Sequence, residues 1–259
     1  MAIVYLNRLD FKNAGDLYSS PYHYINKPGL LSDCYKNKNY YSLSTDSNTL
    51  IVGGGALLQN KKMINVINQA LNTKKFSQKI LWGVGVGQES TTEERELINQ
   101  FDLVGVRDHG KEYDFVPCAS CMHPLFRQTQ KPTKQLLIVD HWKRRPTWVP
   151  FEKYTRVTNI GISIENMIEL IKDHEHIISS SYHAAYWGLL CNRKVLIVSK
   201  PMIPKLQTFH VDVPSSLNFD EGFFHSAKSY PNYYEECLEL NNNFKNRVNN
   251  LIKSQGEIE

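Results

Sequence analysis

The sequence lacks any apolar run that approaches the roughly 18–20 residues of a membrane-spanning helix, so it predicts no membrane-spanning segment. Its N-terminal residues, MAIVYLNRLD, have neither the charged start nor the long apolar stretch of a signal peptide, and they predict a buried strand instead. Cysteine is sparse, because only five occur in 259 residues. A reducing compartment best explains such an odd and sparse set, so we expect a cytoplasmic protein.

Neither sign of charge predominates, since the chain has 30 lysines and arginines and 26 aspartates and glutamates, and its net charge is +4. This excess is too weak to predict nucleic-acid binding, but it suits a small polyanionic substrate or a position near an anionic membrane surface. Hydrophobic residues reach 41% and aromatic residues 11%, which argues against disorder over most of the length. The chain is long enough for one large or two small domains with a packed core.

Short apolar runs alternate with turns and with segments of helical period. Such alternation is typical of parallel βαβ units, and runs that are apolar throughout indicate strands covered on both faces. Thr91 and Glu94 form a capping-box pattern before one helical segment, and Ser163 is a candidate N-cap before another. The expected strands are residues 2–6, 49–52, 79–86, 103–106, 136–139, 176–179 and 195–198.

A polar stretch over residues 128–134, with Pro132 in its middle, reads as a linker. The strand pattern restarts after it. We therefore predict an α/β fold with two Rossmann-like domains, residues 1–130 and 131–230, each with a parallel sheet. Residues 231–259 are expected to form a long helix and a tail.

Ligands of open parallel sheets bind beyond the carboxyl ends of the strands. The first strand is followed by Asn13-Ala14-Gly15-Asp16, where glycine permits close approach of the backbone and a following helix offers unpaired amides to an anion. Asp16 could orient a sugar hydroxyl or act as a base. The alternative is an Asx turn in which Asp16 is the helix N-cap.

Two further turns belong to the first half. Gly53-Gly54-Gly55 lacks the spacing of a dinucleotide fingerprint, so its backbone passes close either to a ligand or to a neighbouring helix. Arg107 ends the fourth expected strand, where a guanidinium is well placed to bind a carboxylate or a phosphate. A structural pair between Arg107 and Asp108, or another acid, is the alternative.

In the second half, three serines and an imidazole stand between a strand and a helix, at Ser179-Ser180-Ser181-Tyr182-His183. Hydroxyls at a helix N-terminus favour anion binding, and His183 could donate a proton near neutral pH. A capping serine and a buried structural histidine are the alternative. The basic run 141–145, with Lys143 and Arg144, is either a solvated surface or a contact for a substrate phosphate.

A lone pair of cysteines, Cys118 and Cys121, has CxxC spacing. No second pair accompanies it, and structural zinc normally has four protein ligands. We therefore expect no metal site there.

Taken together, these turns resemble the polysaccharide pyruvyl transferase family. The matching segments are the Asn-x-Gly-Asp turn at 13–16, IVGGGALL at 51–58, WGVGVG at 82–87, Arg107-Asp108, and SSSYHAAYWGLLCNRKVLIV at 179–198. Their order and spacing carry the resemblance over roughly the first 200 residues.

The resemblance implies a fold like that of GT-B glycosyltransferases, with the active site between the two halves. It also implies transfer of a pyruvyl group from phosphoenolpyruvate to a sugar, commonly as a cyclic ketal. The acceptor would be a cell-surface polysaccharide, such as capsule or exopolysaccharide, or its lipid-linked precursor, and the protein would act at the inner membrane surface. Neither a cofactor nor a metal is implied.

The resemblance also suggests roles for individual residues. We expect Arg107 and His183 to hold phosphoenolpyruvate, with His183 as acid and Asp16 as base. Many family members have arginine where this chain has Ser181, so Lys200 or the 141–145 run is expected to supply the missing cation. The expected substrate-binding residues are Arg107, Asn13, Gly15, Gly54, Gly55, Ser180, Ser181, Tyr182, Lys143, Arg144 and Lys200.

Two other functions stay open. A GT-B glycosyltransferase that uses a nucleotide sugar would need the same glycine turns and basic residues. A non-catalytic glycan-binding relative would keep the fold without the site, and Ser181 in place of arginine is its best support.

Overall fold

The computed structural model describes residues 2–35, 48–73, 76–87, 91–128, 130–143, 153–198, 209–217 and 221–254. The chain forms two compact units. The first consists of Met1–Asp10, Asp16–Met122 and Glu239–Glu259, and the second of Phe11–Gly15 and His123–Leu238. The predicted boundary was at residues 130/131, with the C-terminal helix set apart, whereas the compact units divide at 122/123 and share that helix.

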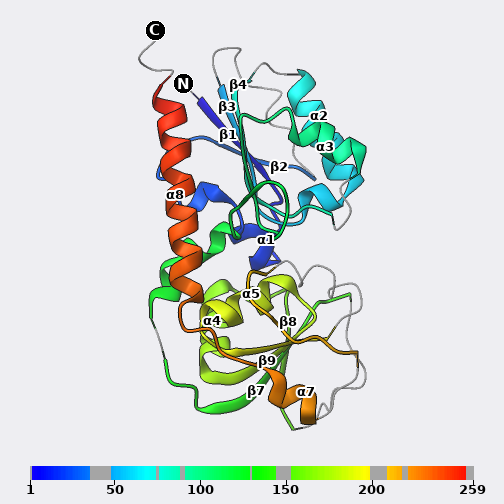
Figure 1. The fold of residues 1–259 in the computed structure, drawn as a ribbon, viewed down its shortest axis with the longest axis vertical. Helices are drawn as coiled ribbons and strands as arrows, with labels where there is room; N and C mark the ends of the chain where they lie inside the picture. The colour runs from blue at the N-terminus through cyan, green and yellow to red at the C-terminus, as the bar shows by residue number, and fades with distance from the viewer. Residues whose placement is uncertain are drawn as a thin grey trace. The chain divides into compact units, whose positions relative to one another are not determined.

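The first unit contains a six-stranded parallel sheet in the order β2-β1-β3-β4-β5-β6 (Figure 1). The predicted strands of this half are confirmed, although Lys79 to Val86 is shifted toward the N-terminus in β4. β2 and β6 were not predicted, because neither has a long apolar run. The strands are β1 (Ala2–Asn7), β2 (Leu30–Asp33), β3 (Asn48–Gly53), β4 (Phe76–Val84), β5 (Leu103–Val106) and β6 (Asp114–Phe115).

Alternation along the strands divides the core of this unit into two layers. Val4 and Leu6 of β1 belong to the layer that includes Ile67 of α2 (Lys61–Thr73) and Leu97 of α3 (Thr92–Ile98). Tyr5, on the opposite face of β1, belongs to the other layer. Both faces of the sheet are therefore covered, as the continuous apolar runs predicted.

The capping box predicted before α3 is half formed. Thr91 is the N-cap, and its Oγ1 accepts a 3.1 Å hydrogen bond from the Glu94 amide. The Glu94 carboxylate instead accepts a 3.0 Å bond from the Gly87 amide. Burial is the main influence on the Glu94 carboxyl group and raises its pKa. Glu94 thus ties the segment after β4 to the start of α3.

The long C-terminal helix is α8 (Tyr233–Lys253), which confirms the prediction for residues 231–253 within two residues at its start. Its Phe244 and Val248 pack in the second core layer of the first unit. The ring of Phe244 meets Trp82 edge to face, with 5.3 Å between the ring centroids. The face of the first sheet that carries Tyr5 is thereby covered by α8 (Figure 1).

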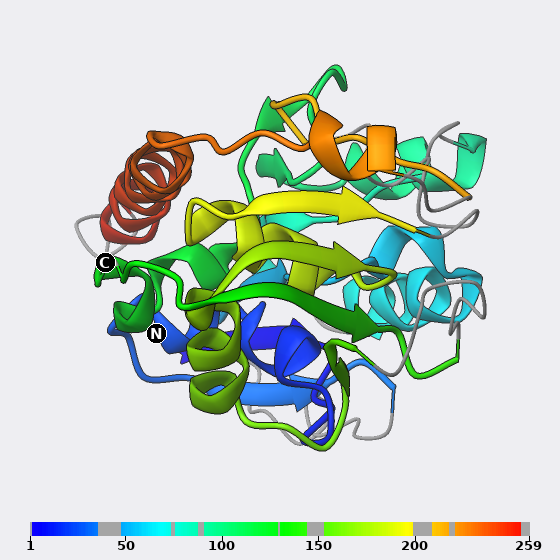
Figure 2. The same cartoon turned by 90° about the horizontal axis from the view of Figure 1, so that it is seen from below.

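The second unit contains a four-stranded parallel sheet in the order β10-β9-β7-β8, whose strands run side by side in Figure 2. Ser163 is the N-cap of α4, as predicted, and its Oγ accepts a 3.2 Å bond from the Asn166 amide. β8 was not predicted. The elements are β7 (Lys134–Asp140), β8 (Thr155–Thr158), α4 (Ile164–Asp173), β9 (His174–Ser179), α5 (Tyr182–Leu190), β10 (Lys194–Ile197) and α7 (Glu221–Ser226).

Both sheets share one topological feature. The first strand of each unit, β1 or β7, lies between the second and third strands of that unit. The direction of the crossovers therefore reverses at this strand, and the carboxyl ends of β1 and β3, or of β7 and β9, form the crevice where such sheets bind ligands. The predicted α/β fold with two parallel sheets and a long C-terminal helix is confirmed.

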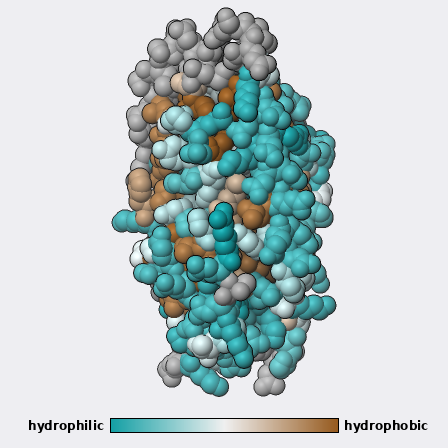
Figure 3. Space-filling model, turned by 90° about the vertical axis from the view of Figure 1, so that its left-hand side faces the viewer, coloured by the Kyte–Doolittle hydropathy of each residue, from teal (hydrophilic) through white to brown (hydrophobic). Residues whose placement is uncertain are grey.

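Among the described residues, no helix combines the length and apolar character needed to cross a membrane. On the face drawn in Figure 3, hydrophilic residues predominate, and the hydrophobic ones form several separate groups rather than one continuous patch.

Candidate functional site

The carboxyl ends of β7 and β9 are joined by serine hydroxyls. Ser180 Oγ accepts a 2.8 Å hydrogen bond from the His141 amide, and Ser179 Oγ donates a 2.9 Å bond to Val139 O. Ser179 Oγ also accepts a 2.9 Å bond from the Ser181 amide. The first two serines of the predicted anion-binding turn therefore hold the turn itself at the topological switch point.

The helix that follows, α5, is buried along all nine of its residues. Its sequence, YHAAYWGLL, has no polar face, which is the pattern of a helix enclosed on all sides. Ser181 is the N-cap residue, yet its side chain makes no capping hydrogen bond. The Ser181 hydroxyl is therefore not used to cap α5.

A small pocket lies at the N-terminus of α5, entirely within the second unit. Side chains from three segments contribute polar groups to it, and an apolar wall completes it. The polar lining residues are Asn13, Asn159, Ser181 and His183, and the apolar wall includes Ile162, Met167 and Trp187. We refer to this hollow as the His183 pocket.

The His183 ring lies directly against the backbone of Gly15. A Cβ atom on Gly15 would stand only 2.4 Å from His183 Nδ1 and 2.6 Å from Cγ. Trp187 packs near the same ring, with 5.8 Å between the ring centroids, and His183 is 9% exposed. Glycine at position 15 is therefore required by the contact with His183. Gly15 also lines the pocket, so its predicted role in substrate binding stays a prediction.

Sequence reasoning missed Asn159. This residue follows β8 and is 9% exposed, and its Oδ1 accepts a 2.9 Å hydrogen bond from the Trp142 amide. Its backbone amide donates to Asp140 O at 2.9 Å, which ties the end of β8 to the end of β7. A polar residue directly after a strand would have been the signal, but β8 itself was not recognised.

Other predicted residues of the second unit lie outside the His183 pocket. Tyr182 stacks on Phe209, with 5.2 Å between the ring centroids and 24° between the ring planes. Lys143 Nζ stands 4.6 Å from the centre of the Trp142 ring, which is a cation–π contact. Arg144 and Lys200 lie outside the described residues.

Arg107 belongs to the first unit and is only 3% exposed. A Cβ atom on Gly85 would come within 2.8 Å of Arg107 Nε, so the guanidinium lies against a glycine backbone. Burial raises the pKa of the nearby Cys118 thiol, and the charge of Arg107 opposes that rise. Neighbouring Asp108 accepts a 2.6 Å bond from the Val86 amide. These contacts give Arg107 and Asp108 structural partners within their own unit.

Gly54 and Gly55 have φ angles of 72° and 71°, in the left-handed region that glycine adopts readily. A Cβ atom on Gly54 would stand 2.2 Å from Ser19 O, and one on Gly55 would meet nothing nearer than 3.9 Å. The close approach anticipated at this turn is therefore an approach to the backbone of Ser19. The Cβ position of Gly55, in contrast, is open.

Asp16 lies in the first turn of α1 (Ala14–Tyr18), so the alternative that it is the N-cap of this helix is wrong. A carboxylate in a first turn interacts favourably with the helix dipole. Asp16 is not among the residues that line the His183 pocket. Its assignment as catalytic base stays a prediction, as does the pairing of Arg107 with His183, because these residues belong to different units.

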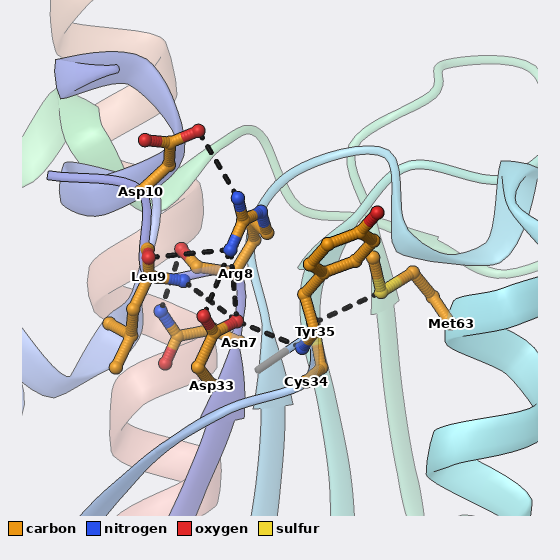
Figure 4. Close-up of polar contacts among 8 residues, drawn as sticks. All are labelled: Asn7, Arg8, Leu9, Asp10, Asp33, Cys34, Tyr35 and Met63. Atoms are coloured by element: carbon orange, nitrogen blue, oxygen red, sulfur yellow. Dashed lines mark hydrogen bonds and ion pairs between the residues drawn. The ribbon is translucent and has the colours of Figure 1, made fainter. Parts of the chain in front are cut away.

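The carboxyl ends of β1 and β2 carry a second polar cluster, shown in Figure 4. Arg8 Nη1 donates to the Asp33 carboxylate at 2.9 Å, and Arg8 Nη2 lies 3.2 Å from Asp10 Oδ2. Asp33 Oδ1 also accepts bonds from the Leu9 amide at 3.3 Å and the Tyr35 amide at 2.9 Å. Asp33 therefore joins the segment after β1 to the end of β2, and we assign this cluster a structural role.

Cys118 and Cys121 are both buried thiols, and neither forms a disulfide. Cys121 Sγ accepts a 3.2 Å hydrogen bond from Asn241 Nδ2. Within the described ranges, no group of three or more histidine, cysteine, aspartate or glutamate side chains is placed to hold a metal ion.

No family model matches this sequence, and neither does any curated protein. Among solved structures, the fold is similar to that of a functionally uncharacterized protein from Klebsiella pneumoniae subsp. pneumoniae NTUH-K2044. The two chains are 14% identical, the match covers 80% of this chain and 86% of the other, and the TM-score is 0.53. At this level of identity the likeness concerns the fold alone.

Proposed function

We propose that this protein is a pyruvyl transferase that holds phosphoenolpyruvate in the His183 pocket and transfers its pyruvyl group to a sugar. The observation that carries the proposal is the convergence of Asn13, Ser181 and His183 at the N-terminus of α5. These three residues were selected from the sequence as part of an anion site. They come from two segments far apart in the chain.

The polar side of the pocket suits an anion. Amides of the first turn of α5 carry partial positive charge, and the Ser181 hydroxyl can donate a hydrogen bond to an oxyanion. The His183 ring can donate a further hydrogen bond, which is charge-assisted when the imidazole is protonated. Phosphoenolpyruvate offers both a carboxylate and a phosphate to such donors.

The apolar wall of the pocket suits the carbon skeleton of a small donor. The side chains of Ile162 and Met167 offer an apolar surface to the methylene carbon of phosphoenolpyruvate.

The proposed reaction begins when His183 donates its proton to the methylene carbon, which leaves positive charge on the central carbon. A sugar hydroxyl attacks this carbon while Asp16 accepts its proton. The carbon–oxygen bond to phosphate then breaks, and phosphate leaves with the bonding electrons. A second hydroxyl of the sugar closes the ketal and its proton passes to the departing phosphate. Donors that stay in place throughout the reaction stabilise the changing charge.

The acceptor in this proposal is a sugar of a cell-surface polysaccharide or of its lipid-linked precursor. Because phosphoenolpyruvate is a cytoplasmic metabolite, we place the reaction in the cytoplasm, at the inner membrane surface. No cofactor takes part, since phosphoenolpyruvate already carries the activated group.

The test is release of inorganic phosphate from phosphoenolpyruvate by the purified protein in the presence of saccharide acceptors. Loss of a general acid typically costs about 10²–10⁴-fold in rate, so His183→Gln should reduce turnover by that factor. His109→Gln, at an exposed position in the first unit, serves as the control and should keep full turnover. Full turnover by His183→Gln would overturn the assignment.

Ligand-dependent thermal stability separates the alternative functions. Phosphoenolpyruvate at about 100 times its Kd should stabilise the protein by roughly 2.7 kcal/mol. Stabilisation by UDP or CMP compounds, without any by phosphoenolpyruvate, would instead indicate a glycosyltransferase. Glycan binding without phosphate release from any donor would indicate a non-catalytic relative.

A further inference from the structure

Two polar groups of the His183 pocket have no hydrogen-bond partner in the described part of the chain. They are Asn159 Nδ2 and Ser181 Oγ. Both side chains are buried, with exposures of 9% and 3%, and both line the pocket. Neither atom is fully buried and both residues line the pocket, so the two groups can donate hydrogen bonds to a group that enters it from outside the chain.

The orientation of the Asn159 amide is determined by the backbone. Because the Trp142 amide can only donate, the atom that it contacts at 2.9 Å must be the amide oxygen of Asn159. The NH₂ group therefore points away from Trp142. The bond from the Asn159 backbone amide to Asp140 O holds the residue in this position.

The Ser181 hydroxyl makes no hydrogen bond to the amides of α5, although Ser181 is the N-cap residue. Ser179 Oγ accepts the hydrogen bond of the Ser181 amide, and Ser181 O accepts the Ala185 amide. The Ser181 backbone is thus held in place without its own hydroxyl. Two donors, one from the end of β8 and one from the start of α5, consequently line one pocket.

We propose that Asn159 Nδ2 and Ser181 Oγ together form an oxyanion subsite of the His183 pocket. The subsite accepts a carboxylate or phosphate oxygen of a small organic acid, because both groups can donate hydrogen bonds to it and neither carries a negative charge. This inference deepens the proposed function and rests on the pocket being the donor site. It adds Asn159 to the residues that touch the substrate.

The decisive variant is Asn159→Asp. Aspartate keeps an oxygen for the Trp142 amide but replaces the NH₂ donor with a second acceptor. We expect the Kd for phosphoenolpyruvate and for inorganic phosphate, measured by isothermal titration calorimetry, to rise by about tenfold or more. The unliganded protein should melt at nearly the same temperature as wild type. Asn232→Asp is the control, because it adds the same charge at an exposed position before α8, and it should bind both anions as wild type does.

A pH series separates a binding role from a structural one. As pH falls and the introduced carboxyl group takes up a proton, it regains a donor. The ratio of variant Kd to wild-type Kd at the same pH should therefore return toward one. Ser181→Ala should weaken the binding of both anions several-fold at every pH, because it removes a hydrogen-bond donor without adding charge.

The outcomes distinguish this subsite from the proposed function. Unchanged anion binding by Asn159→Asp overturns the subsite and leaves the pyruvyl transfer proposal in place. If the wild-type protein binds the anions but releases no phosphate, and Asn159→Asp binds them more weakly, the pyruvyl transfer proposal is overturned and the subsite is supported. Wild type that binds neither phosphoenolpyruvate nor inorganic phosphate overturns both.

Discussion

Trp82 Nε1 donates a 2.9 Å hydrogen bond to Asn241 Oδ1, although the two residues are 159 positions apart. Both side chains are fully buried. The same asparagine donates from Nδ2 to Pro117 O at 3.1 Å and to Cys121 Sγ at 3.2 Å. One amide of α8 therefore satisfies polar groups from β4 and from the segment after β6, and it sets the register of the helix on the first unit.

Asn241→Leu should lower the free energy of unfolding by about 2–4 kcal/mol, because it leaves the Trp82 N–H and Pro117 O buried without partners. Urea denaturation followed by tryptophan fluorescence measures this loss. Asn242→Leu, at the exposed neighbouring position, should change the free energy of unfolding by less than about 0.5 kcal/mol. Equal effects of the two substitutions would show that the Asn241 bonds contribute nothing specific.

Gly15→Ala should impair phosphoenolpyruvate binding and turnover. The new methyl group would need to occupy a position 2.4 Å from His183 Nδ1, so the imidazole must move. A shift of about 1 Å in a catalytic group can cost on the order of 100-fold in rate. The comparison is Gly110→Ala, whose methyl group would meet nothing within 4 Å. Its φ of 78° makes alanine cost about 1–2 kcal/mol of stability, but the variant should keep its turnover. Normal kinetics for Gly15→Ala would contradict the proposed placement of His183.

Gly54→Ala and Gly55→Ala form a matched pair at one turn. Both glycines have φ near +70°, so each alanine bears a similar backbone strain of about 1–2 kcal/mol. Only Gly54→Ala also forces a Cβ atom to within 2.2 Å of Ser19 O. Thermal denaturation should therefore show a clearly larger loss for Gly54→Ala than for Gly55→Ala. Similar melting temperatures for the two variants would mean that the Ser19 contact is unimportant.

The stability of the protein should fall as pH drops below about 6.5, the ordinary pKa of histidine. Burial lowers the pKa of His176, which lies in β9 and is 6% exposed, so the fold favours its neutral form. The unfolded chain takes up a proton at a higher pH than the folded chain. The stabilisation is therefore present above the unfolded pKa and is lost as pH falls toward the folded one.

Urea denaturation at a series of pH values measures this effect. His176→Gln should make the free energy of unfolding less dependent on pH between about 7 and 5. His109→Gln, at an exposed position, should keep the wild-type dependence. An unchanged pH dependence in His176→Gln would assign the effect to other groups.

Much of the candidate site was foreseen from local patterns. Asn13, Ser181 and His183 were selected because they follow apolar runs, and strand ends are where parallel sheets bind ligands. The structure places these three in one pocket. Asn159 was missed because β8, with the sequence TRVT, is short and partly polar, so no strand end marked the residue.

Roles were harder to predict than positions. Gly15 and Gly54 were both expected to bind the substrate. A Cβ atom on either would clash with another part of the chain, His183 for Gly15 and Ser19 for Gly54, while Gly15 also lines the His183 pocket. A glycine in the sequence shows that something passes close to the backbone. It does not show whether that neighbour is a ligand or another part of the chain.

The sequence alone determined the order of strands and helices, because continuous apolar runs and helical periods depend on neighbouring residues. It also determined the ends of the second-unit strands from which His183 and Ser181 extend. Only the tertiary structure decided the strand order in each sheet, the contact of Gly15 with His183, and the bond of Trp82 to Asn241. These features join residues far apart in the chain, so they arise from the packing of the whole unit and not from local preference.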